Sequence, residues 1–168
     1  GCRLSVNPDG YGGAGVLFSI RGSARHPVTL TGDARTPAPG DWAGLCLGNY
    51  DSSASLSYLH LAYAGSGNCG AGAISATASK GTITITHATI AHSAGHDVEL
   101  NGAAALLRDD AFGAVPRGSY GVVNDGGPPV IAADNWWGDP SGPAGAGHGK
   151  GVAVSTGVTF QPWRVAPL

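Results

Sequence analysis

The chain has 168 residues and a mass of 16.6 kDa, which is enough for one domain with a hydrophobic core. Hydrophobic residues make up 42% of it and charged residues 12%, so it is not an intrinsically disordered chain, which would lack apolar surface to bury. The net charge of -2 provides no basic field for nucleic acid, and no run of about 18 apolar residues is present to insert into a membrane.

Short apolar runs closed by Gly, Asn, Asp or Pro dominate the sequence and fall into two alternating series. The first series consists of Phe18–Ile20, Leu45–Leu47, Ala73–Ser75, Val98–Leu100, Val122–Asn124 and Val152–Val154. The second series consists of single apolar anchors at Leu30, Leu61, Ile90, Phe112, Trp136 and Phe160. Successive members of either series lie between 22 and 31 residues apart.

A loose period of this length with β-type units is typical of a solenoid, in which stacked coils share one core. The six members of each series therefore predict an all-β parallel β-helix of about six coils. The predicted inward column is Leu45, Ala73, Val98, Val122 and Val152, while Cys46 and Glu99 are expected to point outward. A β-sandwich is the alternative, but it does not require alternate strands to resemble each other.

Three segments carry a more specific signal. They contain His26-Pro27-Val28-Thr29-Leu30 with Pro39-Gly40-Asp41-Trp42, then Leu59-His60-Leu61-Ala62-Tyr63, then Asn135-Trp136-Trp137-Gly138-Asp139-Pro140 closing with Phe160-Gln161-Pro162-Trp163. Across about its whole length the chain thus resembles the bacterial right-handed parallel β-helix repeat proteins, which share their fold with pectate lyases and polygalacturonases. The resemblance implies a right-handed solenoid and places the tryptophan segment in its last coils.

We therefore expect a single domain over residues 1–168, with a C-terminal cap around residues 133–168. Gly1 is followed directly by a strand-like run, so an N-terminally truncated solenoid is expected. A solenoid must cover its terminal core, and Trp136 and Trp163 are large enough to do so. Because neighbours on a strand point to opposite faces, Trp137 is a candidate for binding a sugar by stacking.

The candidate catalytic residues are Tyr58, His87 and Asp109. Aligning Leu56, Ile85 and Leu107 places these three in one column on successive coils. A histidine beside a carboxylate is a possible acid–base pair. The competing interpretation is a turn, where Asp side chains accept backbone hydrogen bonds; it covers Asp109, Asp110 and Asp134, with Asp134 aligned to Asp110.

The known catalytic sets of the superfamily are not matched. Polygalacturonases carry an acidic pair before a Gly-His-Gly segment, whereas here Gly95–Asp97 precedes Asp109 and Asp110. A pectate-lyase-like group of calcium-binding aspartates is not found either, and Arg108 stands alone. The sequence therefore favours a module without catalytic activity.

Two further candidates for ligand binding are Tyr63 and His92. His87 and His92 lie five residues apart across a strand bend, which does not aim two imidazoles at one ion, so we expect neither a metal nor another cofactor. Cys46 and Cys69 form a disulfide in one interpretation, which leaves Cys2 odd; in the other, all three are thiols.

The leading hypothesis is a non-catalytic extracellular or cell-surface module with a structural, adhesive or assembly role. The alternative is a polysaccharide-binding or polysaccharide-degrading module, acting as a lyase or glycosidase. The expected partners are a polysaccharide or another surface protein. A second copy of the chain is a further candidate, because an open N-terminal coil exposes unpaired strand edges.

Overall fold

The computed structural model describes residues 4–6, 17–48, 53–65, 67, 70–77 and 81–168. This part of the chain is all-β; no helix occurs in it, and hence none long and apolar enough to cross a membrane. Its strands form three sheets in which the paired strands are parallel. The parallel pairing confirms the predicted parallel β-structure and excludes the β-sandwich alternative, whose sheets are antiparallel.

Each strand belongs to one of the three sheets. The seven-stranded sheet has the order β1 (Leu4–Val6), β4 (Leu45–Gly48), β7 (Gly72–Thr77), β10 (His96–Asn101), β13 (Val122–Asn124), β16 (Gly151–Val154), β15 (Pro143–Gly145). The six-stranded sheet has the order β17 (Val158–Thr159), β14 (Val130–Ile131), β11 (Ala104–Arg108), β8 (Thr82–Thr86), β5 (Ser53–Ser57), β2 (Leu17–Arg21). The four-stranded sheet has the order β12 (Ala111–Phe112), β9 (Thr89–Ala91), β6 (Leu59–Ala62), β3 (Val28–Leu30).

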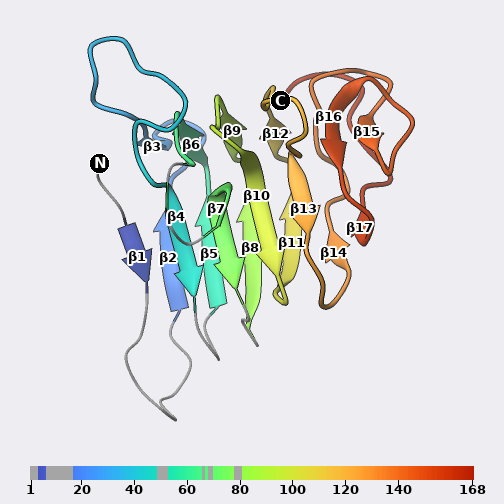
Figure 1. Ribbon diagram of the computed structural model, residues 1–168, viewed down its shortest axis with the longest axis horizontal. Helices are drawn as coiled ribbons and strands as arrows, with labels where there is room; N and C mark the ends of the chain where they lie inside the picture. The colour runs from blue at the N-terminus through green and yellow to red at the C-terminus, as the bar shows by residue number, and fades with distance from the viewer. Residues whose placement is uncertain (1–3, 7–16, 49–52, 66, 68–69, 78–80) are drawn as a thin grey trace.

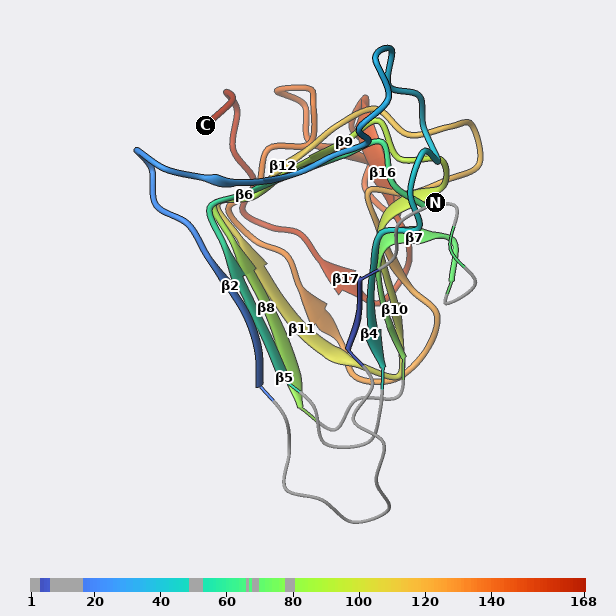
Figure 2. The ribbon, with the colours of Figure 1, turned by 90° about the vertical axis from the view of Figure 1, so that its left-hand side faces the viewer.

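From β2 to β13, successive strands therefore enter the six-, four- and seven-stranded sheets in turn, and three strands make one coil. The coils lie side by side along the long axis (Figure 1). Seen along that axis, the three sheets are the three sides of a triangular section (Figure 2). This arrangement is compatible with a parallel β-helix.

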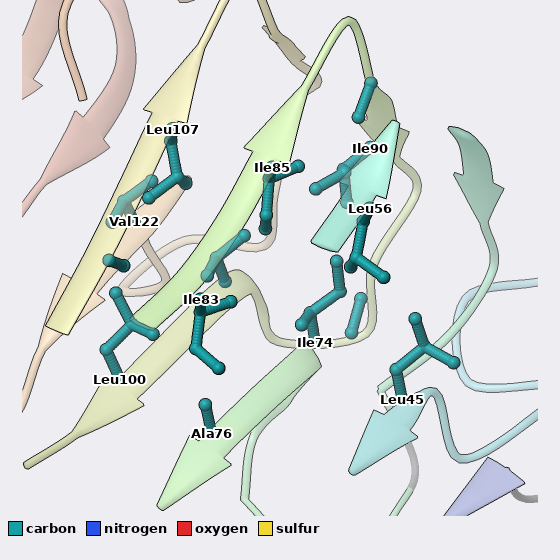
Figure 3. Packing of buried hydrophobic residues seen from close by; sticks show 14 of the residues in the cluster. Leu45, Leu56, Ile74, Ala76, Ile83, Ile85, Ile90, Leu100, Leu107 and Val122 are labelled. Carbon is teal, nitrogen blue, oxygen red and sulfur yellow. The ribbon is translucent and has the colours of Figure 1, made fainter. Parts of the chain in front are cut away.

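The core consists of aliphatic columns that run along the stack. One column, paired in register and at most 1% exposed, is formed by Leu45, Ile74, Val98 and Val122. Another, fully buried, is formed by Leu56, Ile85 and Leu107. Figure 3 shows the members of both columns that it labels among the buried side chains between the sheets. Burial of each such side chain stabilises the fold by roughly 1.5–3 kcal/mol, so the columns hold the coils together.

Two members of the predicted inward column are wrong. Ile74, not Ala73, pairs with Leu45 and Val98, and Val154, not Val152, pairs with Val122. The first error arises because residues 72–76 of β7 are buried on both faces, so that hydrophobic alternation carries no information about register there. Cys46 does lie on the outer side, in register with Ser75 and Glu99, although it is only 4% exposed.

The tryptophan that is fully buried towards the C-terminal end of the core is not the one that was predicted. Trp137 is fully buried and stacks on Phe112, with ring centroids 4.6 Å apart, whereas Trp136 is only half-buried. The reason is register: Trp136 bridges to Ala111, which places the following residue, Trp137, in line with Phe112. Trp163, predicted to be part of the cap, is half-buried and packs against the core.

Candidate functional site

The predicted column of Tyr58, His87 and Asp109 is present at the corner between the six- and four-stranded sheets, here called the first corner. Each residue follows a strand of the six-stranded sheet and precedes a strand of the four-stranded sheet. Their φ angles are 50°, 55° and 57°, in the left-handed region, so the chain bends sharply at this position. The rings of Tyr58 and His87 stack with centroids 4.6 Å apart and an interplanar angle of 21°.

Asp109 is bonded to an arginine rather than to His87. Arg164 donates from Nη2 to Asp109 Oδ1 and from Nε to the carbonyl oxygen of Asp134, the latter at 3.0 Å. Arg108 lies 3.5 Å from the carboxylate of Asp134. Within the described residues no hydrogen bond or ion pair joins His87 to Asp109. The predicted acid–base pair is therefore not formed in this structure, and arginines bind the carboxylates of Asp109 and Asp134 instead.

The neighbouring residue Asp110 lies inside the corner. It is fully buried, and its Oδ1 accepts the Ala88 N–H at 2.8 Å. One coil further on, Asn135 Oδ1 accepts the Asp110 N–H at 2.8 Å, and Asn135 Nδ2 donates to the Leu107 carbonyl at 3.0 Å. The turn interpretation is right for Asp110, but its alignment with Asp134 is wrong. Asn135 is the equivalent of Asp110, while Asp134, at φ 62°, follows Asp109.

The environment of Asp110 favours its neutral form. Burial raises its pKa from the ordinary 3.8 to about 8, although the hydrogen bond from Ala88 opposes this shift. In the described part of the chain, Asp110 Oδ2 has no hydrogen-bond partner, which is consistent with an oxygen that carries the proton. A neutral carboxyl group offers an acceptor oxygen and an O–H donor, much as the amide of Asn135 offers an acceptor oxygen and N–H donors. Asp110 and Asn135 therefore form one structural ladder rather than a catalytic pair.

The Gly95–Asp97 segment also has a structural role. Asp97 is fully buried and accepts a hydrogen bond of 2.6 Å from the Ser93 hydroxyl. Burial raises the pKa of Asp97 well above its ordinary value, while the Ser93 hydrogen bond opposes the shift. His96 Nδ1 accepts the Tyr120 N–H at 2.9 Å, and the two rings stack. The side chains of His96 and Asp97 therefore both accept hydrogen bonds from the protein at the start of β10.

The ligand-binding candidates Tyr63 and His92 form a second stack, at the corner that follows β6 and β9, here called the second corner. Their ring centroids are 4.9 Å apart, the planes differ by 7°, and both φ angles are left-handed, at 62° and 56°. Tyr63 is half-buried and His92 is exposed. The third candidate, Trp137, is fully buried in the core, so its ring is not available to a ligand in this structure.

Sequence reasoning missed a polar cluster on the outer side of the seven-stranded sheet. Glu99 Oε2 accepts hydrogen bonds from the Gly72 N–H at 2.9 Å and from the Ser75 hydroxyl at 3.1 Å. A Cβ added at Gly70 would lie 2.3 Å from the same carboxylate, so only glycine allows this approach. The outward position of Glu99 and the glycines of 70–72 were the available signals. The cluster holds this segment against the sheet.

Cys46, next to this cluster in register, is disulfide-bonded. The other two cysteines, including the candidate partner Cys69, lie outside the described residues, as does the start of the chain at Gly1. The described part of the chain also contains no group of three or more His, Cys, Asp or Glu side chains that could hold a metal ion.

Comparisons with family models, with curated proteins and with solved structures found no match to this chain. Its function must therefore be inferred from its own residues. The carboxylates considered for catalysis are either buried, as Asp97 and Asp110 are, or bonded to arginine, as Asp109 and Asp134 are. At the two corners there remain two exposed histidine side chains, His87 and His92, each stacked on a half-buried tyrosine.

Proposed function

We propose that this chain is a non-catalytic, extracellular or cell-surface module, built as a right-handed parallel β-helix of about six coils. Its role in this proposal is structural, adhesive or in assembly. The observation that carries the proposal is the bond between Arg164 and Asp109. A glycosidase needs two carboxyl groups facing one cleft with room for a substrate, and here an arginine from the C-terminal segment occupies the carboxylate of the candidate column.

Two further observations support parts of the proposal. The disulfide of Cys46 supports an extracellular location, since disulfides persist in oxidising compartments. An assembly role is supported by the repeated parallel strands themselves, since among the described residues each coil pairs with the next through its backbone and strands of another chain can pair in the same way.

The proposal is tested by incubating the protein with pectin, polygalacturonate, alginate and neutral polysaccharides, with and without calcium. We expect neither reducing ends nor unsaturated products above the level of a buffer control. Product release that is abolished by both His87→Ala and Asp109→Asn, but kept in the matched variant Tyr120→Leu, would overturn the proposal. It would make Tyr58, His87 and Asp109 an active site.

A further inference from the structure

The same pair of residue types stands at both ends of two neighbouring short strands. Tyr58 and His87 precede β6 and β9, while Tyr63 and His92 follow them. Between the two stacks, His60 and Thr89 are paired in register and exposed on the outer side of the strands. The Tyr–His face is defined by Tyr58, His60, Tyr63, His87, Thr89 and His92. It spans two coils and one side of the triangular section seen in Figure 2.

The backbone conformation does not call for aromatic residues at these corners. Glycine, asparagine, aspartate and histidine adopt left-handed φ angles most readily, while bulky residues such as tyrosine are uncommon there. At the first corner the next two coils indeed carry Asp109 and Asp134. Within the described residues, the aromatic and imidazole rings at left-handed φ all lie in two adjacent coils. Backbone outliers of this kind gather at functional sites, where the side chain is needed for itself.

The polar atoms of the Tyr–His face are available to a ligand. Within the described residues, no side chain of this face makes a hydrogen bond to another protein group. His60, His87, Thr89 and His92 are exposed, and the two tyrosines are half-buried. Stacking holds each tyrosine and histidine ring in place, so a ligand meets donors and acceptors that are already ordered.

The chemistry of the face defines the class of ligand. With histidine neutral, none of its six side chains carries a formal charge, which disfavours a strongly charged ligand. Tyrosine and threonine hydroxyls and imidazole nitrogens both donate and accept hydrogen bonds, which suits a polyhydroxylated molecule. The stacks lie five residues apart along each coil, so at a strand rise of about 3.3 Å per residue they are at most roughly 16 Å apart. That length accommodates a chain of several sugar rings.

We propose that the Tyr–His face binds a neutral oligosaccharide chain that lies along β6 and β9 and contacts one Tyr–His stack at each end. This inference rests on the proposed function, in that the module holds the glycan without cleaving it. The first stack of the face borders the arginine-bonded carboxylate of Asp109, which lies one coil further along the first corner and is not part of the face.

The test is calorimetric titration of the full chain at pH 7.5 with cellohexaose, xylohexaose and mannohexaose, and with a galacturonate hexamer. Two double variants remove one stack each: Tyr58→Asn with His87→Asn, and Tyr63→Asn with His92→Asn. Asparagine tolerates left-handed φ, so both variants are expected to fold, which the unfolding temperature checks. The matched control is Tyr120→Leu, which removes the ring of the third Tyr–His stack, outside this face.

We expect at least one neutral hexamer to bind, each double variant to weaken that binding at least about tenfold, and the control to leave it unchanged. Lack of binding by all three neutral hexamers, binding of the galacturonate hexamer alone, or equal affinities in folded double variants would each overturn the inference. Chromatography of the hexamers after incubation separates the two proposals. Shortened products would overturn the non-catalytic function, while the affinities still decide the binding site.

Discussion

Two regions of the described stack, one near each end, differ in how deeply their apolar side chains are buried. At the C-terminal end, Trp137 is fully buried and stacks on Phe112. At the N-terminal end, Phe18 and Ile20 of β2 are only partly buried, and Leu17 is 58% exposed. The burial of core side chains therefore differs along the stack: the column of Leu61, Ile90 and Phe112 continues into the fully buried Trp137, whereas the inward side chains of β2, the terminal strand of its sheet, are only partly buried. The position of a residue along the stack, and not its type alone, determines how much stability it contributes.

The largest loss of stability is expected at Trp137. Trp137→Ala should lower the free energy of unfolding by about 3–5 kcal/mol, because a fully buried aromatic leaves a large cavity when truncated. Trp136→Ala is the matched control and should cost clearly less, since Trp136 is half-buried. Urea unfolding measures both. A loss for Trp136→Ala equal to or above that for Trp137→Ala would contradict the assignment of the cap.

A smaller difference in stability is expected between β2, near the N-terminal end, and β5, further inside the stack. Ile20 and Leu56 are paired in register in one column, but only Leu56 is fully buried. Leu56→Ala should cost about 2–5 kcal/mol, and Ile20→Ala should fall below that range because its site is already partly solvated. The comparison uses urea midpoints with unchanged m-values. Equal losses would mean that the N-terminal end is covered in solution.

The smallest effect concerns how the free energy of unfolding depends on pH through the Asp110–Asn135 ladder. The folded-state pKa of Asp110, about 8, lies above the unfolded value of 3.8, so the folded state holds a proton that the unfolded state releases between these values. The stability from this group is complete below about pH 4 and is lost as the pH rises towards 8. The free energy of unfolding should therefore fall on the order of 1 kcal/mol per pH unit within this window.

Asp110→Asn is the variant that isolates this contribution. Its amide reproduces the neutral carboxyl group, and the carbonyl of Ile85, one coil before Leu107, is the expected acceptor of its Nδ2. Asp97 has a pKa raised in the same direction, so a residual slope should persist in the variant. Urea unfolding at pH 5, 6 and 7 measures both slopes. A slope unchanged by the substitution would show that Asp110 is not protonated in the folded state.

Much of the coil arrangement could be predicted from spacing alone. Aligning Leu56, Ile85 and Leu107 by their sequence spacing was enough to place Tyr58, His87 and Asp109 in one column. The reason is that these strands pair in register, so the residue two positions after each one falls at the same corner. The predicted register is wrong at Ala73, where both faces of the strand are buried, and at Val152, in a strand whose pairing with β15 shifts register.

The partners of the polar groups could not be predicted in this way. Arg164 reaches Asp109 across 55 residues of sequence, and the sequence contains no sign of that contact. Asp109 and Asp110 are neighbours in sequence but differ in environment. Asp109 is bonded to arginine on the outside of the corner, whereas Asp110 is buried and neutral inside it. Local sequence does not distinguish them, since either could follow the bend.

The sequence by itself determined the class of fold, because the recurrence of apolar runs specifies stacked β-coils whatever the details of each turn. Only the tertiary structure decided which of two adjacent residues faces the core, at Trp136 and Trp137 and again at Asp109 and Asp110. Alternation along a strand makes neighbours point in opposite directions, but pairing with the preceding coil selects which one points inward. The same pairing brings Tyr58, Tyr63, His87 and His92 onto one side of the molecule, where the proposed oligosaccharide site lies.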